Sequence, residues 1–206
     1  MTDRPKLLAD PVEQAARVAR LYETHIAPLT RFVELVRLEA GPEKVIPYFD
    51  PWDGGTGAEI LYLLEAPGAK AAASGFISRN NPDETAKNFF ELNEAAGISR
   101  DRTITWNIVP WYIGTTEKIR AAGRVDIKAG IPILARLLEF LPKLRAIVLI
   151  GRKAEQAEES IQRLRPSIRI FRSPHPSPLF INNAPGNRTR ILSVLKSVAE
   201  DVGPVR

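Results

Sequence analysis

The chain has 206 residues, of which 44% are hydrophobic, and its 29 Lys and Arg against 24 Asp and Glu give a formal net charge of +5. It contains no cysteine, which excludes disulfide bonds, a thiolate nucleophile and Cys-ligated zinc or iron–sulfur clusters, and no apolar run is long enough to cross a membrane. The excess of basic residues is compatible with an anionic partner, nucleic acid above all.

The N-terminal part of the sequence is expected to be helical. Asp10 followed by Pro11 is typical of a helix N-cap and first turn. Apolar residues then recur at helical spacing over 12–38, where Pro28 predicts either a kink or a division into two helices. His25 lies within this stretch and is expected to be a surface or capping histidine rather than a ligand.

The turn-rich segment 47–57 carries Tyr48, Phe49 and Trp52 at high density. Such a loop can pack over the edge of a site, or it can simply cover one end of a sheet. Both interpretations stay open at this point.

Four short apolar runs predict buried parallel strands, separated by enough chain for crossover helices. The expected strands span 60–64, 103–109, 146–150 and 168–171, and the expected helices between and after them span 82–96, 131–140, 153–164 and 188–201. This alternation predicts a three-layer α/β fold, in which helices flank a four-stranded parallel sheet. We expect one domain over 1–206, with an N-terminal helical part (1–45) and an α/β core (58–200).

The segments that follow the four strands have unusual compositions. They are Glu65-Ala66-Pro67-Gly68, the stretch around Asn107, Gly151-Arg152-Lys153, and the loop Ser173-Pro174-His175-Pro176-Ser177-Pro178-Leu179-Phe180. Ligands of open α/β sheets bind outside the carboxyl ends of the strands, so these segments are expected to converge on one site. The last loop presents an imidazole among three prolines, which stiffen the backbone.

Each candidate residue also has a structural interpretation. Glu65 could hold a water or a ligand, or it could be a helix N-cap or lie in a solvated loop. The Asn107 amide could pair with a base edge, or be satisfied by neighbouring backbone. Phe76 could stack on a planar ligand or belong to the core. Arg152 and Lys153 could bind phosphate or be plain surface residues.

Taken in order, Glu65-Ala66-Pro67-Gly68, Phe76, Asn107 and the His175 loop resemble the uracil-DNA glycosylase superfamily. The first motif is similar to the Gly-Glu-Ala-Pro-Gly of the family 4 enzymes, with Leu64 in place of the first glycine, and the His-Pro-Ser-Pro-Leu run is similar to that of family 1. Order and spacing match over about 60–199. The resemblance implies the superfamily's four-stranded parallel sheet flanked by helices, which agrees with the pattern of strands and helices above.

The resemblance also implies roles for single residues. Glu65 would help to position the hydrolytic water, and His175 would donate to O2 of the departing uracil. The base would be held by Ala66, by Phe76 stacking on it, and by Asn107 at its Watson–Crick edge. DNA contacts are implied for Gly68, Asn80, Asn81, Arg152, Lys153, Ser173, Ser177 and Leu179, with Leu179 filling the hole left in the duplex.

Three positions depart from the family patterns. Ala66 stands where family 1 enzymes carry the aspartate that activates water, so that task would fall to Glu65, Asn80, Asn81 or Asp83. Gly68 stands where family 1 enzymes exclude thymine with a tyrosine. Trp111 stands where family 4 enzymes have one of four cluster cysteines, which implies a member without an iron–sulfur cluster.

The expected activity is that of a monofunctional uracil-DNA glycosylase without metal or cofactor. It would bind uracil-containing DNA as a monomer and release uracil, leaving an abasic site in an intact DNA strand. Because no secretory signal is visible, we expect a cytoplasmic protein. Two alternatives stay open: a low-turnover protein of the same fold that binds damaged or abasic DNA, which the Ala66 position favours, and a small-molecule α/β hydrolase.

Overall fold

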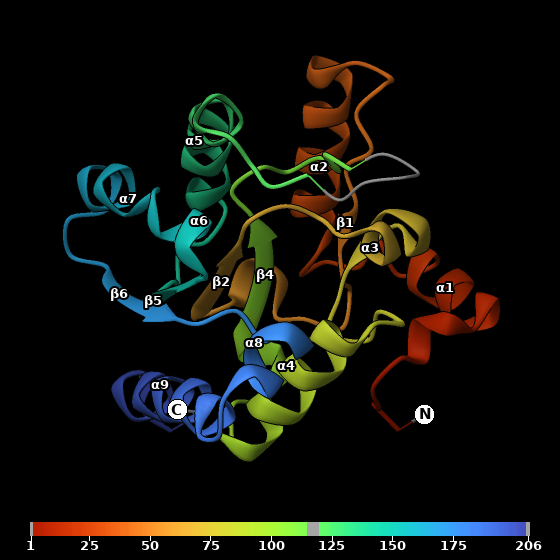
Figure 1. Cartoon of the computed structure of the whole chain (residues 1–206). Coiled ribbons are helices and arrows are strands. Elements are labelled where there is room, and N and C mark those ends of the chain that lie inside the picture. The colour runs from red at the N-terminus through yellow and green to blue at the C-terminus, as the bar shows by residue number, and fades with distance from the viewer. Residues whose placement is uncertain (1, 115–119, 205–206) are drawn as a thin grey trace.

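The computed structural model describes residues 2–114 and 120–204. Its centre is a parallel sheet in the order β4-β2-β5-β6 (Figure 1). The four strands are β2 (Ile60–Leu64), β4 (Thr103–Asn107), β5 (Ala146–Ile150) and β6 (Arg169–Ser173). The expected α/β fold with a four-stranded parallel sheet is therefore confirmed.

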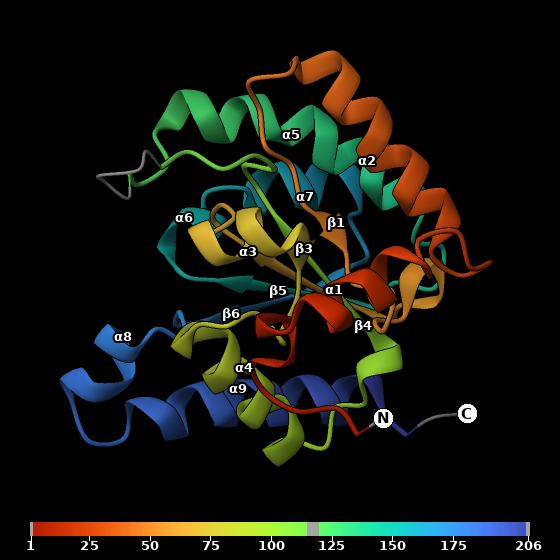
Figure 2. The ribbon, with the colours of Figure 1, turned by 90° about the vertical axis from the view of Figure 1, so that its right-hand side faces the viewer.

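Helices cover both faces of this sheet (Figure 2). On one face lie α2 (Ala27–Ala40), α5 (Arg124–Glu139), α6 (Arg152–Glu155) and α7 (Glu158–Leu164), and on the other lie α4 (Glu84–Ala95), α8 (Pro178–Asn183) and α9 (Asn187–Val202). The remaining elements are α1 (Pro11–Val18), α3 (Ala69–Ser74), the 3-10 turns η1 (Leu7–Ala9), η2 (Gly55–Gly57) and η3 (Arg100–Arg102), and the short parallel pair β1 (Tyr48–Phe49) and β3 (Phe76–Ile77).

The strands form two layers of core because successive side chains point to opposite faces. In β2, Leu61 and Leu63 join the cluster under α2 and α5, whereas Ile60 and Tyr62 join the cluster under α4 and α9. All four side chains are buried. A parallel strand buried on both faces reads as an unbroken apolar run, which is why this strand is visible in the sequence.

The N-terminal helical stretch is divided in two. α1 ends at Val18 and α2 begins at Ala27, with Pro28 in its first turn, where a missing N–H breaks no helical bond. Asp10 caps α1, as expected, by accepting a hydrogen bond from the N–H of Val12 at 2.9 Å.

Two helix expectations were wrong in detail. The helix expected over 131–140 begins already at Arg124 and contains Pro132 in its interior. The helix expected over 153–164 is two helices, α6 and α7, that meet at residues 156–157. None of the helices in the described residues is long and apolar enough to span a membrane.

From Asp50 onward, the segment 47–57 covers the amino end of the sheet, whereas Phe49 stacks on Trp106, the second-last residue of β4, with ring centroids 4.5 Å apart. The N–H of Gly54 donates to the carbonyl of Thr103, the first residue of β4, at 2.8 Å. Asp50 in this segment is fully buried and binds Arg17 Nε at 2.9 Å and Arg100 Nη2 at 2.6 Å. The interpretation as a sheet cover therefore holds for residues 50–57.

Candidate functional site

A cavity of about 650 Å³ opens at the carboxyl ends of the strands. From β2 the chain runs to β4 on one side, and it later returns to β5 on the other side, so the strand order reverses between β2 and β5. Such a reversal leaves a crevice in which ligands of open α/β sheets bind. The cavity is lined by Glu65 after β2, by Gly151, Arg152 and Lys153 after β5, by Ser173, Pro174 and His175 at the end of β6, and by Phe180 and Arg190.

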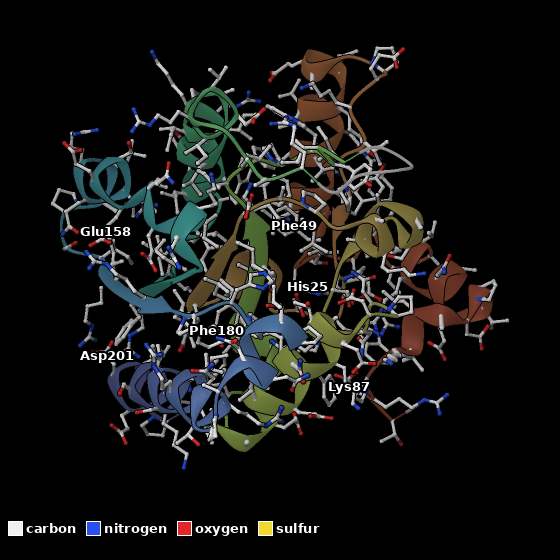
Figure 3. All side chains as sticks on the ribbon, in the orientation of Figure 1. His25, Phe49, Lys87, Glu158, Phe180 and Asp201 are labelled. Carbon is white, nitrogen blue, oxygen red and sulfur yellow. The ribbon has the colours of Figure 1, made fainter. Side chains whose placement is uncertain are left out.

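The structure thus brings together two of the residues singled out in the sequence, Glu65 and His175, which are far apart along the chain. Phe180, which the sequence placed beside the histidine, lines the same cavity from α8 (Figure 3).

The backbone around His175 is held on two sides. Asn88 of α4 donates from Nδ2 to the carbonyl of the buried Pro176 at 3.1 Å. Gly151 lies against the imidazole with φ of 83°, and a Cβ at this position would come within 3.4 Å of the His175 Cβ. A side chain at residue 151 would therefore be strained by its backbone conformation and would press on the histidine.

The two histidines of the chain differ in their partners. His25 bonds through Nε2 to the carbonyl of Pro51 at 2.9 Å, in keeping with the structural role expected for it. The imidazole of His175 makes no hydrogen bond with residues 2–114 or 120–204. A half-buried ring without a partner is free to bond to a ligand in the cavity.

Burial lowers the pKa of His175, because an imidazolium loses hydration in the cavity wall. The carboxylates of Glu65 and Asp83 oppose this effect without cancelling it. His175 is therefore neutral at pH 7, and its ring can donate one hydrogen bond while carrying no charge.

This lowered pKa predicts a pH dependence of stability. The folded protein binds fewer protons at His175 than the unfolded chain, whose histidine has the usual pKa of 6.5. The contribution of His175 is fully present above pH 6.5 and is lost as the pH falls through 6.5 toward the lower folded value. Urea unfolding from about pH 7.5 to about pH 5.5 should show a smaller loss of stability in His175→Gln than in the wild type. Equal losses in both proteins would contradict this assignment.

Glu65 is neither a helix cap nor a freely solvated side chain. Its Oε1 accepts a hydrogen bond of 2.5 Å from the N–H of Ala122, in the segment before α5. Helix α3 is capped instead by Gly68, with no side-chain cap. Within the described residues, Oε2 of Glu65 has no hydrogen-bond partner, so one oxygen is fixed and the other is available.

Asn107 ends β4, directly beside Leu64 of β2. It is only 3% exposed, yet its side-chain amide makes no hydrogen bond to the described part of the chain. The interpretation as an asparagine satisfied by neighbouring backbone is therefore not supported. Asn107 is not among the residues that line the cavity, but it lies one strand away from Glu65 at the same edge of the sheet.

Phe76 lies apart from this cavity. It is 1% exposed in the short strand β3, packs against Leu8 and Leu21, and its ring centroid is 6.4 Å from that of Tyr48. Of the two interpretations of Phe76, stacking on a ligand or belonging to the core, its position supports the core. Ala66 is half-buried and packs against the cluster under α2 and α5.

Asn80 and Asn81 do not fit the DNA contacts expected of them. Both are buried, Asn80 donating to Asp3 Oδ1 at 2.7 Å and Asn81 to the carbonyl of Phe76 at 2.9 Å. Ser74 Oγ in turn donates to Asn81 Oδ1 at 2.6 Å. The two amides join the N-terminal segment and β3 to the core, so we assign them no contact with DNA and no role in activating water.

The other expected DNA contacts are placed near the cavity mouth or on exposed elements. Arg152 and Gly68 are exposed, and Leu179 is 85% exposed on α8. Ser177 caps α8, accepting from the N–H of Phe180 at 3.3 Å. Ser173 is 2% exposed and its hydroxyl donates to the carbonyl of Pro174 at 3.1 Å, so it is a structural residue as much as a lining one.

Sequence reasoning missed three residues at the cavity and the His175 loop. Asn88 and Arg190 come from helices α4 and α9 and carry no local motif, and Arg172 of β6 lines the cavity while pairing with Glu158 at 2.6 Å. The only signal for Arg172 is its place two residues before Pro174 on an edge strand, which is too common to single it out.

A sequence model of the family described as the Uracil DNA glycosylase superfamily matches residues 51–196. No curated protein matches the chain. Among solved structures, SMUG2 of Pedobacter heparinus is similar, with a TM-score of 0.53 and 13% identity over 86% of this chain and 84% of that one, a likeness that supports the fold. A candidate uracil DNA glycosylase from Methanosarcina acetivorans gives a TM-score of 0.48 and 19% identity over 69% of this chain and 92% of that one. A mutant of the UNG of Nitratifractor salsuginis gives 0.48 and 13% over 93% of this chain and 98% of that one.

Proposed function

The chain belongs to the uracil-DNA glycosylase superfamily, as its motifs predict, and we propose that it flips uracil out of DNA and hydrolyses the N-glycosidic bond to leave an abasic site. Membership of the family supports a DNA glycosylase, a hydrolase that acts in DNA repair. The observation that carries the proposal is that Glu65 and His175 line one cavity at the reversal of strand order.

The chemistry of the two side chains suits this reaction. Cleavage of the glycosidic bond builds negative charge on the departing uracil, and a fixed hydrogen-bond donor stabilises that charge in the manner of an oxyanion hole. His175 is neutral and without a partner in the described residues, so its N–H is available for uracil O2. Glu65, anchored through Oε1, would use Oε2 to orient the attacking water.

Asn107 supports the choice of a nucleobase as ligand. Its buried amide has no partner in the described residues, and an amide offers a donor and an acceptor in one plane. The Watson–Crick edge of uracil likewise presents a donor and an acceptor in one plane, so the amide can pair with it. Phe76 has its partners in the core, so we do not assign base stacking to it.

The surroundings of the cavity suit DNA. A base inside a duplex is out of reach of such a cavity and must be extruded, which requires loss of stacking. Leu179 is an exposed apolar side chain on α8, one residue before the cavity-lining Phe180, and could fill the vacated space. Arg152 and Arg190 could contact phosphates on either side. We propose that one chain, folded as a single domain, does this as a monomer in the cytoplasm.

The wedge role of Leu179 predicts a substrate-dependent effect. Leu179→Ala should lower excision of uracil from duplex DNA about tenfold and leave excision from single strands nearly unchanged, because only the duplex must be unstacked. The measurement is the single-turnover rate on both substrates. Leu38→Ala is the matched control, since Leu38 is 81% exposed on α2. Equal losses on both substrates would argue against a wedge.

The proposed function is tested by incubating the protein with a duplex that carries one U·G or U·A pair, with EDTA present. Strand breaks that appear only after alkali would support a monofunctional glycosylase without metal. Tight binding of abasic DNA without excision would favour the low-turnover binding protein. Ala66 favours this alternative because it stands in place of the aspartate that activates water in family 1 enzymes. If the protein neither binds the duplex nor produces strand breaks, both the glycosylase and the binding protein are refuted, and the small-molecule hydrolase is left.

A further inference from the structure

The main chain of Ala122 joins two charged side chains at the cavity. Its N–H donates to Oε1 of Glu65 at 2.5 Å, and its carbonyl accepts from Nζ of Lys153, also at 2.5 Å. Ala122 itself is fully buried. Both polar groups of this residue therefore depend on these two side chains for their hydrogen bonds.

The three residues come from three different strand ends. Glu65 follows β2, Lys153 lies in the first turn of α6 after β5, and Ala122 precedes α5 in the connection from β4. The next residue, Gly123, is fixed as well, since its N–H donates to Asp126 Oδ2 in α5 at 2.7 Å. Lys153 thus ties the segment before α5 to the end of β5, and that segment in turn holds the Glu65 carboxylate.

We propose that Lys153 is a positioning residue for Glu65, acting through Ala122, and not a phosphate contact. The proposal rests on the proposed function of the site. The ammonium group donates to the carbonyl of the buried Ala122. Without it, the buried carbonyl loses its partner, the segment relaxes, and the N–H that orients Glu65 shifts. Small displacements of a reacting group have large effects on rate.

The neighbouring Arg152 provides the contrast. It is exposed and makes no hydrogen bond or ion pair with the described residues, although it follows the same glycine and lines the same cavity. A guanidinium in that setting is free to meet a phosphate. The two adjacent basic residues therefore differ in role. A substitution of Arg152 should lower the DNA affinity, whereas a substitution of Lys153 should lower the excision rate.

The test compares Lys153→Met, Arg152→Met and Lys143→Met, the last an exposed lysine just before β5 at the other end of the sheet. For each variant the single-turnover excision rate at saturating enzyme is measured, together with the DNA affinity over a series of salt concentrations. Lys153→Met should excise at least tenfold more slowly with unchanged affinity and salt dependence. Arg152→Met should bind more weakly, and its salt slope should fall by about one. Lys143→Met should match the wild type.

A second measurement does not depend on activity. The amide proton of Ala122 should resonate far downfield because it bonds to a carboxylate, and should move upfield in both Lys153→Met and Glu65→Gln. Lys153→Arg, which keeps a donor, should recover part of the excision rate and of the amide shift. This recovery separates positioning from a general loss of folding.

Two results would overturn the role of Lys153. One is normal single-turnover excision by Lys153→Met with weaker, less salt-dependent binding, which would make Lys153 a phosphate contact. The other is an unchanged Ala122 amide resonance in that variant. Absence of excision by the wild type would instead refute the proposed function, and the amide measurement would then still show whether Lys153 holds the Glu65 carboxylate through Ala122.

Discussion

His175→Ala is expected to lower the single-turnover rate of uracil excision by about 10²-fold, the effect of removing one fixed donor from an oxyanion-type site. The expectation rests on a neutral imidazole that lines the cavity without a partner in the described residues. Since Gly151 and Asn88 hold this loop, the donor is already oriented before substrate arrives. DNA affinity should change little, because the bond to O2 strengthens only as the base departs.

The control for this prediction is the other histidine of the chain. His25→Gln keeps a side chain that can bond to the Pro51 carbonyl, and His25 is not among the residues that line the site cavity. It should excise at the wild-type rate. A His175→Ala enzyme with wild-type turnover would remove the histidine from the leaving-group role, whatever its DNA affinity.

Asp50→Ala is expected to lower the free energy of unfolding by about 3–5 kcal/mol, the loss that follows when one partner of a buried charge network is removed. Asp50 is fully buried, and besides its bonds to Arg17 and Arg100 it accepts from the N–H of Trp52 at 2.9 Å. Burial alone would raise the pKa of Asp50, but Arg100 and Arg17 outweigh burial and lower it. Its removal leaves the fully buried Arg17 without its closest carboxylate.

Urea unfolding at pH 7 measures this effect, with Glu159→Ala as the matched control. Glu159 pairs with Arg163 at 2.5 Å on the surface of α7, where its side chain is 84% exposed. An exposed ion pair contributes little, so this variant should unfold close to the wild type. Similar stabilities of Asp50→Ala and Glu159→Ala would show that the buried network adds nothing to the fold.

The two ends of the sheet differ in how their polar groups are satisfied. At the amino end, Arg100 donates to both Asp50 and Asp53. Glu13 Oε2 and Arg17 Nη1, which are buried there without a hydrogen bond, form an ion pair at 3.6 Å. At the carboxyl end, the His175 ring and the Asn107 amide have no partners in the described residues. Polar groups without an internal partner at a cavity can be completed by a ligand. The amino end stabilises the fold, and the carboxyl end is where we propose chemistry.

The sequence determined the central strands and the order of the motifs. The strands 60–64 and 146–150 have the expected bounds, because strands buried on both faces are unbroken apolar runs. The edge strand β6 was placed about one residue early and ended two residues early, since its exposed Arg169 and Arg172 interrupt the apolar pattern. The pair β1 and β3 has two residues in each strand, too few for any periodicity.

At the site, local sequence was enough for Glu65 and His175, which stand in short motifs directly after strands. It was not enough for Phe76, Asn80, Asn81 or Lys153, whose chemistry permits either a ligand or an internal partner. For Asn80 and Lys153 only the tertiary structure decided between these, because their partners are distant in the chain: Asn80 donates to Asp3, and Lys153 donates to Ala122. Hydrogen bonds between residues distant in sequence follow from packing of the whole fold, which no local pattern encodes.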